Sequence, residues 1–307
     1  MIIFDLLFSV IMPVFAIIGV GVLVDRTLKV DLPTLARLNF WVFVPSLLFL
    51  KVLDAELDGN QIAWITLYAV SHAAVLFTIA WLITMHPRLH DHRVIIRMGA
   101  VLFNCGNYGI PFVTLAFHGE AGTVAIAALA VMIMAQNMLS YTLGVCLLES
   151  ESSSPRRLLK GLFRIPVIYA IVIALLLRTF DLNLLDPLRA PLQYLSQGLI
   201  PVALITLGVQ LSRSNPGQAK LTVSVITIVR LLISPIVATV LVFLFGFERN
   251  LALVLIAISG LPMAVNVFIL CAHYERDEDL ASQAVFWSTL LSALSLPLIL
   301  ILISLFA

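Results

Sequence analysis

The sequence predicts an all-α integral membrane protein with ten transmembrane helices, arranged as a five-plus-five inverted repeat in which helices 4 and 9 are broken and cross. Three observations support this fold class. Hydrophobic residues make up 61% of the 307 positions and charged residues 11%, whereas soluble domains are about half apolar and about a quarter charged. Apolar segments of spanning length recur along the chain, and prolines recur in register with them.

The apolar segments predict ten spans, because a transmembrane helix needs ~20 mostly apolar residues. They lie at residues 5–24, 35–53, 61–84, 94–117, 121–148, 161–179, 191–211, 218–245, 250–273 and 281–306. The first residues lack the positive region of a cleaved signal peptide, so we expect the first apolar segment to be retained as a helix. The connections are short and polar, which leaves no segment for a soluble domain.

Lysines and arginines in the loops predict the orientation. Loops after odd-numbered spans carry most of them, including the pair Arg156-Arg157, and loops after even-numbered spans carry few. Because positively charged loops stay in the cytoplasm, we expect both termini on the extracytoplasmic side of a plasma membrane, the inner membrane in bacteria. The net charge of +1, without a polybasic run, argues against nucleic acid as a partner and leaves the lipid bilayer as the surroundings.

The prolines indicate an internal duplication. Pro13 and Pro166, Pro45 and Pro201, and Pro111 and Pro262 are each separated by about 150 residues, and they pair span one with six, two with seven and four with nine. The repeats would be residues 1–150 and 156–307, with five helices each. Because five is odd, the second repeat enters the membrane with the opposite orientation, as in many transporters.

Span four contains the most informative segment, Asn104-Cys105-Gly106-Asn107-Tyr108-Gly109-Ile110-Pro111. An unpaired backbone group in lipid costs several kcal/mol, so a helix can break at this depth only where protein or a water-filled cavity covers the break. Secondary transporters bind their substrates at such breaks. Asn104, Asn107, Gly109 and Pro111 are therefore candidate substrate-binding residues. The alternative is an ordinary proline kink, with glycines for close helix packing.

Span nine has a similar interruption, Ser259-Gly260-Leu261-Pro262-Met263-Ala264-Val265-Asn266. Because proline suits the first turn of a helix, Pro111 and Pro262 are each expected to start a second half-helix whose positive end faces the crossing. Free N–H groups there, with the amide of Asn266, favour an anion such as a carboxylate. The C-terminal ends of the first half-helices could instead favour a cation or a proton carrier. For span nine, a simple proline kink is an equal alternative.

Three more polar residues inside the spans are candidates for the site. Arg230 lies near the middle of span eight, where an arginine costs at least ~2.5–3.5 kcal/mol, so we expect it to face a cavity or a partner. It either adds positive charge for the substrate or binds carbonyl oxygens exposed by the break in span nine. Gln136 and Asn137 in span five could line the site or form hydrogen bonds between helices.

Other chemistry has no support in the sequence. No aspartate or glutamate lies in the middle of a predicted span, so the usual carboxylate for proton or sodium coupling is missing. Three cysteines lie inside spans without paired spacing, and His86, His90 and His92 match no metal-binding motif, so we expect neither a metal site nor a cofactor. No nucleophile elbow or paired carboxylates occur, and we therefore expect no enzyme and no catalytic residues.

These motifs resemble the auxin efflux carrier family. The resemblance rests on Asn104-x-Gly106-Asn107-x-Gly109-x-Pro111 in span four and Leu261-Pro262-x-x-x-Asn266 in span nine, with Leu38-Asn39-x-x-x-Phe43-x-Pro45 and Pro201-x-x-Leu204-x-x-Leu207-Gly208 in spans two and seven. It implies an architecture similar to that of bile-acid/sodium symporters, with helices 1, 2, 6 and 7 as a scaffold and helices 3–5 and 8–10 as a transport domain. It also implies that an organic anion binds at the crossing, with Asn104 contacting the carboxylate. The short loop between spans five and six resembles bacterial members, often described as malonate or malate permeases.

The sequence thus predicts a secondary active or facilitative transporter. It would move a small organic anion by alternating access of an elevator type, with the substrate at the crossing of helices 4 and 9 and with a homodimer as a candidate assembly. The alternative is a membrane receptor or sensor that binds the same anion without moving it. Flux would separate the two.

Overall fold

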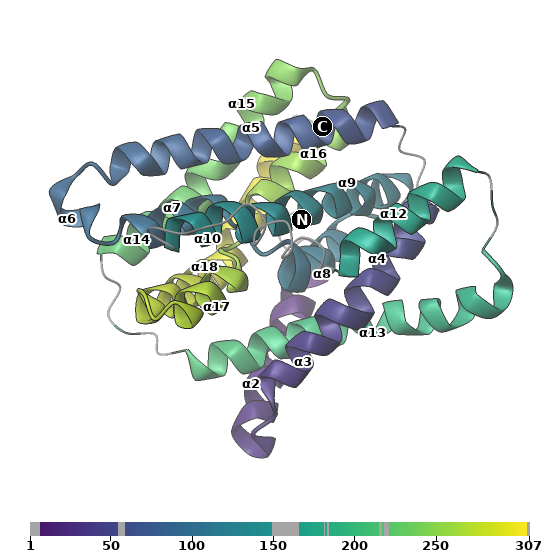
Figure 1. Cartoon of the computed structure of the whole chain (residues 1–307), viewed down its shortest axis with the longest axis horizontal. Coiled ribbons are helices and arrows are strands. Elements are labelled where there is room, and N and C mark those ends of the chain that lie inside the picture. Colours follow the sequence, from purple (N-terminus) through teal and green to yellow (C-terminus); the bar gives the residue numbers. More distant parts are fainter. Residues whose placement is uncertain are drawn as a thin grey trace.

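A computed structural model describes residues 7–54, 59–148, 166–180, 182, 184–214, 217 and 221–305. Every regular element in these ranges is a helix, and one isolated antiparallel β-bridge joins Phe103 to Met263. Figure 1 shows long helices packed side by side around several shorter ones. The boundary between the two predicted repeats, residues 149–165, lies outside the described residues.

The elements up to residue 148 are η1 (Leu7–Ile11), α2 (Met12–Leu28), α3 (Leu32–Leu38), η2 (Asn39–Phe43), α4 (Val44–Leu53), α5 (Gly59–Ile83), α6 (Pro87–His90), α7 (Arg93–Val101), η3 (Cys105–Gly109), α8 (Ile110–Ala116), α9 (Gly119–Leu139), η4 (Ser140–Gly144) and α10 (Val145–Leu148). The later elements are α12 (Pro166–Thr179), α13 (Asp186–Arg213), α14 (Leu221–Ile228), η5 (Val229–Ile233), α15 (Ser234–Phe245), α16 (Arg249–Ser259), α17 (Val265–His273) and α18 (Glu278–Leu305). Elements named η are single turns of π-helix within or beside longer helices.

Seven continuous helical stretches of the described chain are long and apolar enough to cross a membrane. They are Phe8–Leu28, Leu32–Leu53, Gly59–Ile83, Ala121–Leu148, Asp186–Arg213, Leu221–Phe245 and Glu278–Ile303. Each coincides with one of the ten predicted spans. The predicted span at 161–179 appears as the shorter α12, and its residues 161–165 lie outside the described part of the chain.

The two remaining predicted spans are interrupted, as the sequence indicates. The segment 94–117 forms α7, then extended residues, then η3 and α8, and the segment 250–273 forms α16 and α17 with extended residues between them. Both interruptions fall in the predicted motifs.

The expected start of a second half-helix was wrong at Pro262 and holds in part at Pro111. Pro111 does lie in the first turn of α8, but the π-turn η3 precedes it without a gap, so the helical path begins at Cys105. Pro262 starts no helix, because the β-bridge of its neighbour Met263 keeps this segment extended and Ala264 still has a ψ of 135°. The second half-helix therefore begins at Val265.

Four of the π-turns have a common cause in proline. Proline lacks an N–H and its ring clashes with the carbonyl four residues earlier, so the preceding turn widens. In each case the turn ends two residues before the proline: η1 before Pro13, η2 before Pro45, η3 before Pro111 and η5 before Pro235.

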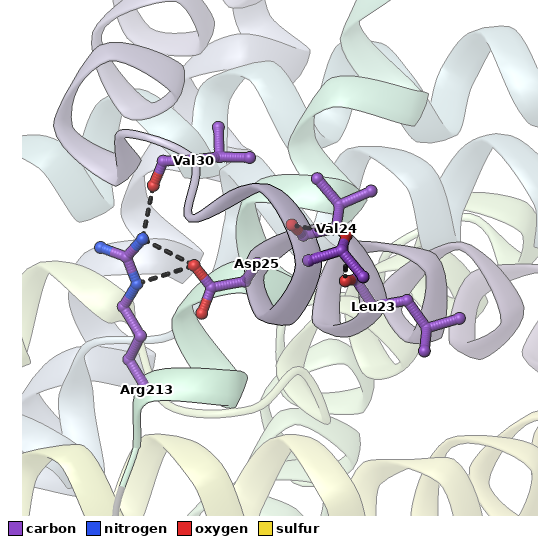
Figure 2. A network of polar contacts seen from close by, with 6 residues as sticks. Leu23, Val24, Asp25, Val30 and Arg213 are labelled. Carbon is purple, nitrogen blue, oxygen red and sulfur yellow. Dashed lines mark hydrogen bonds and ion pairs between the residues drawn. The ribbon is translucent and has the colours of Figure 1, made fainter.

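The long helices pack in two groups. In the first, α13 packs along α2 and α4, and α12 packs on α4. Gly21 and Gly208 allow the close approach of α2 and α13, because a Cβ at Gly208 would lie 2.1 Å from the carbonyl oxygen of Ile18. The guanidinium of Arg213, at the end of α13, donates from Nη2 to Asp25 Oδ1 of α2 at 2.6 Å. It also donates to the Val30 carbonyl, and Figure 2 shows these contacts from close by.

The second group contains both interrupted segments. Helix α5 packs against α7, α9 and α15, helix α16 packs against α9, α15 and α18, and α14 and α17 both pack on α18. The two groups also contact each other, through α4 on α9 and α13 on η3.

Candidate functional site

The two interruptions meet each other directly. The N–H of Asn104 donates to the carbonyl oxygen of Pro262 at 2.9 Å, and the N–H of Ala264 donates to the carbonyl oxygen of Leu102 at 3.0 Å. These bonds flank the Phe103–Met263 bridge, so the two breaks satisfy part of each other's backbone. Proline accounts for one part of this arrangement, because the carbonyl of Pro262 is available as an acceptor although its nitrogen cannot donate.

Side chains from neighbouring helices satisfy more of the exposed backbone. Gln136 of α9 accepts from the Phe103 N–H through Oε1 at 3.1 Å and donates from Nε2 to the Val101 carbonyl at 3.3 Å. Ser288 of α18 accepts from the Met263 N–H at 3.1 Å. Each of these groups would otherwise be a buried unpaired backbone group, at a cost of about 1–3 kcal/mol.

Arg230 lies between the two breaks and is fully buried. Its guanidinium donates to the carbonyl oxygens of Ala100 at 2.6 Å, Ser259 at 2.5 Å and Leu261 at 3.3 Å, and to the hydroxyl of Ser234. Its carbon Cζ also lies 4.6 Å from the centre of the Phe103 ring, a cation–π distance. The charge therefore faces carbonyl oxygens at the ends of α7 and α16, which favours the second of the two interpretations made from the sequence.

A cavity of about 470 Å³ lies beside the bridge. Its walls come from both groups of helices: from α3, η2, α4, α12 and α13 of the first, and from the two breaks, α9, η4 and α17 of the second. Its polar lining side chains are mostly amides, and none of the described lining residues is acidic. The polar lining residues are Arg37, Asn104, Asn107, Gln136, Asn137, Ser140, Thr206, Gln210, Asn266 and His273.

Among the predicted site residues, all of which the structure describes, only Asn104 has a buried side-chain atom without a hydrogen-bond partner. Its side chain is 6% exposed, and the buried Nδ2 has no hydrogen-bond partner. It precedes η3 without capping it through its side chain. A buried donor without an acceptor costs free energy, so an acceptor atom in the cavity would stabilise this side chain.

The cavity brings together five of the nine predicted site residues, Asn104, Asn107, Gln136, Asn137 and Asn266. The other four do not line it. Gly109 is buried where a Cβ would lie 2.8 Å from Leu261 Cδ1, Pro111 is buried in α8, Pro262 is buried in the second break, and Arg230 lies behind the bridge. These four residues shape and hold the breaks.

Sequence reasoning missed five polar lining residues, and one of them, Ser140, lies in η4 and donates from its hydroxyl to the Gln136 carbonyl at 2.8 Å. Gln210 and Thr206 lie on α13, and Arg37 lies on α3 near the predicted start of span two. Gln210, like Gln136, is an amide inside a predicted span, and this pattern could have identified it. It was missed because it lies at the predicted end of that span. His273 ends α17.

The position of Arg37 depends on how α3 begins. Asp31 caps this short helix, since its Oδ2 accepts from the Thr34 N–H at 3.0 Å and from the Thr34 hydroxyl. These bonds, first from the hydroxyl and then from the backbone, lower the pKa of the Asp31 carboxyl. The cap fixes α3, and with it the exposed Arg37 beside the cavity.

Comparison with known proteins points to transport. Residues 6–300 match the model of a family described as membrane transport protein. An uncharacterized transporter of Methanothermobacter thermautotrophicus is 27% identical over 271 residues, which cover 87% of this chain and 88% of that protein. A similar protein of Methanocaldococcus jannaschii, also named an uncharacterized transporter, is 26% identical over 292 residues, or 91% of this chain and 90% of that one. A protein of Rhizobium meliloti named "Putative malonate transporter" is 22% identical over 299 residues, 92% of each chain.

Proposed function

Because the chain belongs to the membrane transport protein family, the family of the auxin efflux carriers, we propose that it is a carrier that moves a small organic anion across the membrane. The membrane location and the transporter class follow from the family and from seven apolar helices of spanning length. We further propose that the substrate is a carboxylate, that it binds at the crossing of the two broken helices, and that it is moved by alternating access.

The observation that carries the proposal is the unpaired amide of Asn104. Asn104 lines the cavity and its buried Nδ2 has no hydrogen-bond partner, while Asn107, Asn137 and Asn266 of the same lining offer further amide groups. A carboxylate accepts hydrogen bonds from amide N–H groups, and bonds to a charged acceptor are among the strong ones. The first turn of η3, at Gly106 and Asn107, also lines the cavity and presents helix N–H groups with a favourable dipole.

The absence of acidic groups among the described lining residues, together with Arg37 and His273, makes the cavity better suited to an anion than to a cation. A small dicarboxylate fits this lining, because one carboxylate can meet the amides while the other faces Arg37. The relative named as a malonate transporter gives further support for this substrate class. Malonate is therefore the first probe.

We propose ten spans in a five-plus-five inverted repeat, with residues 1–150 and 156–307 as the repeats. Seven continuous helices, the shorter α12 and the two interrupted segments together match the ten predicted spans. The proline pairs and the antiparallel meeting of the two breaks support a pseudo-twofold relation. The loop charges favour both termini outside a plasma membrane.

The two packing groups suggest how transport occurs. Helices α2, α4, α12 and α13 would form a fixed scaffold, and the helices around the two breaks would move against it as a unit. The anion site has walls from both groups, so such a shift would open the site to alternate sides. Arg230 would keep the two breaks together during the movement, and Gln136 would hold the first break on α9.

Uptake of labelled malonate into proteoliposomes tests the proposal. A carrier should accumulate or exchange malonate, and Asn104→Ala should lose this activity while it keeps the wild-type elution profile in size-exclusion chromatography. Binding of malonate to the wild-type protein without flux would indicate a sensor instead. Full uptake by a well-folded Asn104→Ala variant would contradict the assignment of the site.

A further inference from the structure

A second cavity, of about 340 Å³, lies along a different face of α9 from the anion site. Ile133, Gln136 and Asn137 of α9 line the anion cavity. Eight residues on another face of α9 and η4 line the second one: Ala127, Ala130, Val131, Met134, Ala135, Met138, Leu139 and Thr142. Helix α9 therefore separates the two cavities.

The second cavity is an elongated groove. Its α9 residues recur every three or four positions, which places them on one helix face over about 22 Å, at 1.5 Å per residue. The other walls come from α4, α5 and α12, through Val52, Val70 and Leu175 among others. The length exceeds the ~15 Å that one leaflet contributes to a hydrocarbon core of ~30 Å, so the groove accommodates an extended acyl chain.

The two threonine hydroxyls in the described lining are hydrogen-bonded within their helices, and a charged side chain lies only at one end of the groove. The hydroxyl of Thr66 donates to the Ile62 carbonyl at 2.8 Å, and that of Thr142 donates to the Met138 carbonyl at 2.6 Å, so both are satisfied within their own helices. Among the described lining residues, Arg178 alone is charged. It lies in the last turn of α12 and is partly exposed, which places its guanidinium where a helix end meets the membrane surface.

We propose that this groove binds one acyl chain of an anionic phospholipid, with the lipid phosphate held by Arg178. An apolar groove of this size without an occupant forfeits dispersion contacts along its walls, and acyl chains surround the protein in the bilayer. The single positive charge at the end of the groove complements a lipid phosphate and selects anionic headgroups. The bound chain supports α9, the helix whose Gln136 holds the first break.

The test uses the purified full-length protein, freed of lipid in detergent. Phosphatidylglycerol and phosphatidylcholine with the same acyl chains are added in turn, native mass spectrometry counts the bound lipids, and thermal unfolding reports stability. The wild-type protein should retain one phosphatidylglycerol more tightly than phosphatidylcholine, with a rise in the unfolding midpoint of roughly 5 °C or more at saturation.

Two pairs of variants localise the lipid. Val70→Trp fills the groove from the exposed side of α5 and should remove the retained lipid, whereas Val172→Trp, at an exposed position of α12 outside the groove, should keep it. Ala130→Trp from the α9 wall is a second filling variant. Arg178→Gln should bind both lipids equally, whereas Arg26→Gln, at the end of α2, should keep the preference.

Several results would overturn the proposal. Equal lipid retention by the wild-type protein and the folded filling variants would show that the groove is not the binding site. A preference for phosphatidylglycerol that survives Arg178→Gln would remove the headgroup assignment. An equal rise in midpoint with glycerol phosphate alone would show a site for free phosphate. None of these measurements depends on transport, so they stand apart from the test of the anion site.

Discussion

At the scale of single residues, Asn104 is the group on which the proposed binding of an anion should depend most. Asn104→Asp keeps the size of the side chain but replaces the Nδ2 donor with a negatively charged acceptor. It should weaken malonate binding at least tenfold, because a hydrogen bond to a charged group contributes about 1.5–3 kcal/mol and the new charge repels the anion. The shift of the thermal unfolding midpoint on addition of malonate measures this loss.

Asn60→Asp is the matched control. Asn60 is exposed in the first turn of α5 and lies outside the lining of the cavity, so this substitution adds the same charge without touching the site. It should leave the malonate response unchanged. An unchanged response in Asn104→Asp as well would show that Asn104 does not bind the anion.

Arg230 should act on the site through the backbone that it holds. Arg230→Ala leaves the carbonyls of Ala100 and Leu261 without this donor, and each such buried group costs about 1–3 kcal/mol, whereas the Ser259 carbonyl keeps the hydrogen bond from the Ser234 hydroxyl. We expect the unfolding midpoint to fall by roughly 5–10 °C. Millimolar guanidinium ion should restore part of this loss, because it can occupy the vacated position and donate to the same oxygens.

The control for Arg230 is Arg178→Ala, which removes a partly exposed arginine and should show no rescue by guanidinium. If guanidinium raises the unfolding midpoint of both variants by the same small amount, Arg230 stabilises the protein through packing alone. A wild-type malonate response in Arg230→Ala would separate its structural role from substrate binding.

The site residues that could be recognised from the sequence are polar residues inside apolar segments, because placing such residues in a membrane costs free energy. Asparagines near glycine and proline in apolar segments marked the two breaks, and the cavity lining includes three of them, Asn104 and Asn107 from the first break and Asn266 from the second. Whether Arg230 faces substrate or backbone could not be predicted, because its partners come from α7 and α16, far away in sequence. Gln210 and Arg37 reach the cavity only through helix packing.

At the scale of helices, the contact of α2 with α13 should be the least tolerant of added volume. A Cβ at Gly21 would lie 2.4 Å from the Ile205 carbonyl oxygen, whereas nothing lies within 4 Å of a Cβ at Gly19 in the same helix. Gly21→Ala should therefore destabilise the protein by about 1–3 kcal/mol, since the two helices must move apart. Gly19→Ala should be neutral or stabilising, because alanine favours helix.

Thermal unfolding of the two glycine variants, side by side, checks this prediction. Equal midpoints would mean that α2 and α13 do not approach as closely as the structure indicates. The comparison tests the scaffold independently of any substrate.

Gln136 should control the mobility of the first break. Gln136→Leu removes both its bond to the Phe103 N–H and its bond to the Val101 carbonyl. Hydrogen exchange in the peptide that contains Phe103 should become roughly five- to tenfold faster, because a bond of about 1–1.5 kcal/mol no longer protects this amide. An unchanged exchange rate would show that the bridge to Met263 is sufficient to hold the break.

The helices themselves were largely predictable from the sequence, because apolar length determines spanning segments. Seven predicted spans match continuous helices, and both predicted interruptions are present. The position at which a helix resumes was less predictable. Proline permits a helix start without requiring one, and at Pro262 the pairing of Met263 with Phe103 keeps the chain extended as far as Ala264.

At the scale of the whole molecule, the cavity beside the two breaks has walls from both groups of helices. The amides at the breaks belong to one group, and Thr206, Gln210 and Arg37 belong to the other. A relative shift of the groups would therefore change the contacts of a bound anion. This division gives the proposed carrier a way to release its substrate on the opposite side, and it makes net transport the decisive property.

Charge movement on solid-supported membranes that carry the purified protein is the most direct test of the central claim. Malonate, malate and indole-3-acetate would be applied in turn, with and without a sodium or pH gradient. We predict a sustained current for at least one of these carboxylates, and its loss in Asn104→Ala. A sustained current of the same size in a well-folded Asn104→Ala protein would contradict an anion site at the junction of the two broken helices.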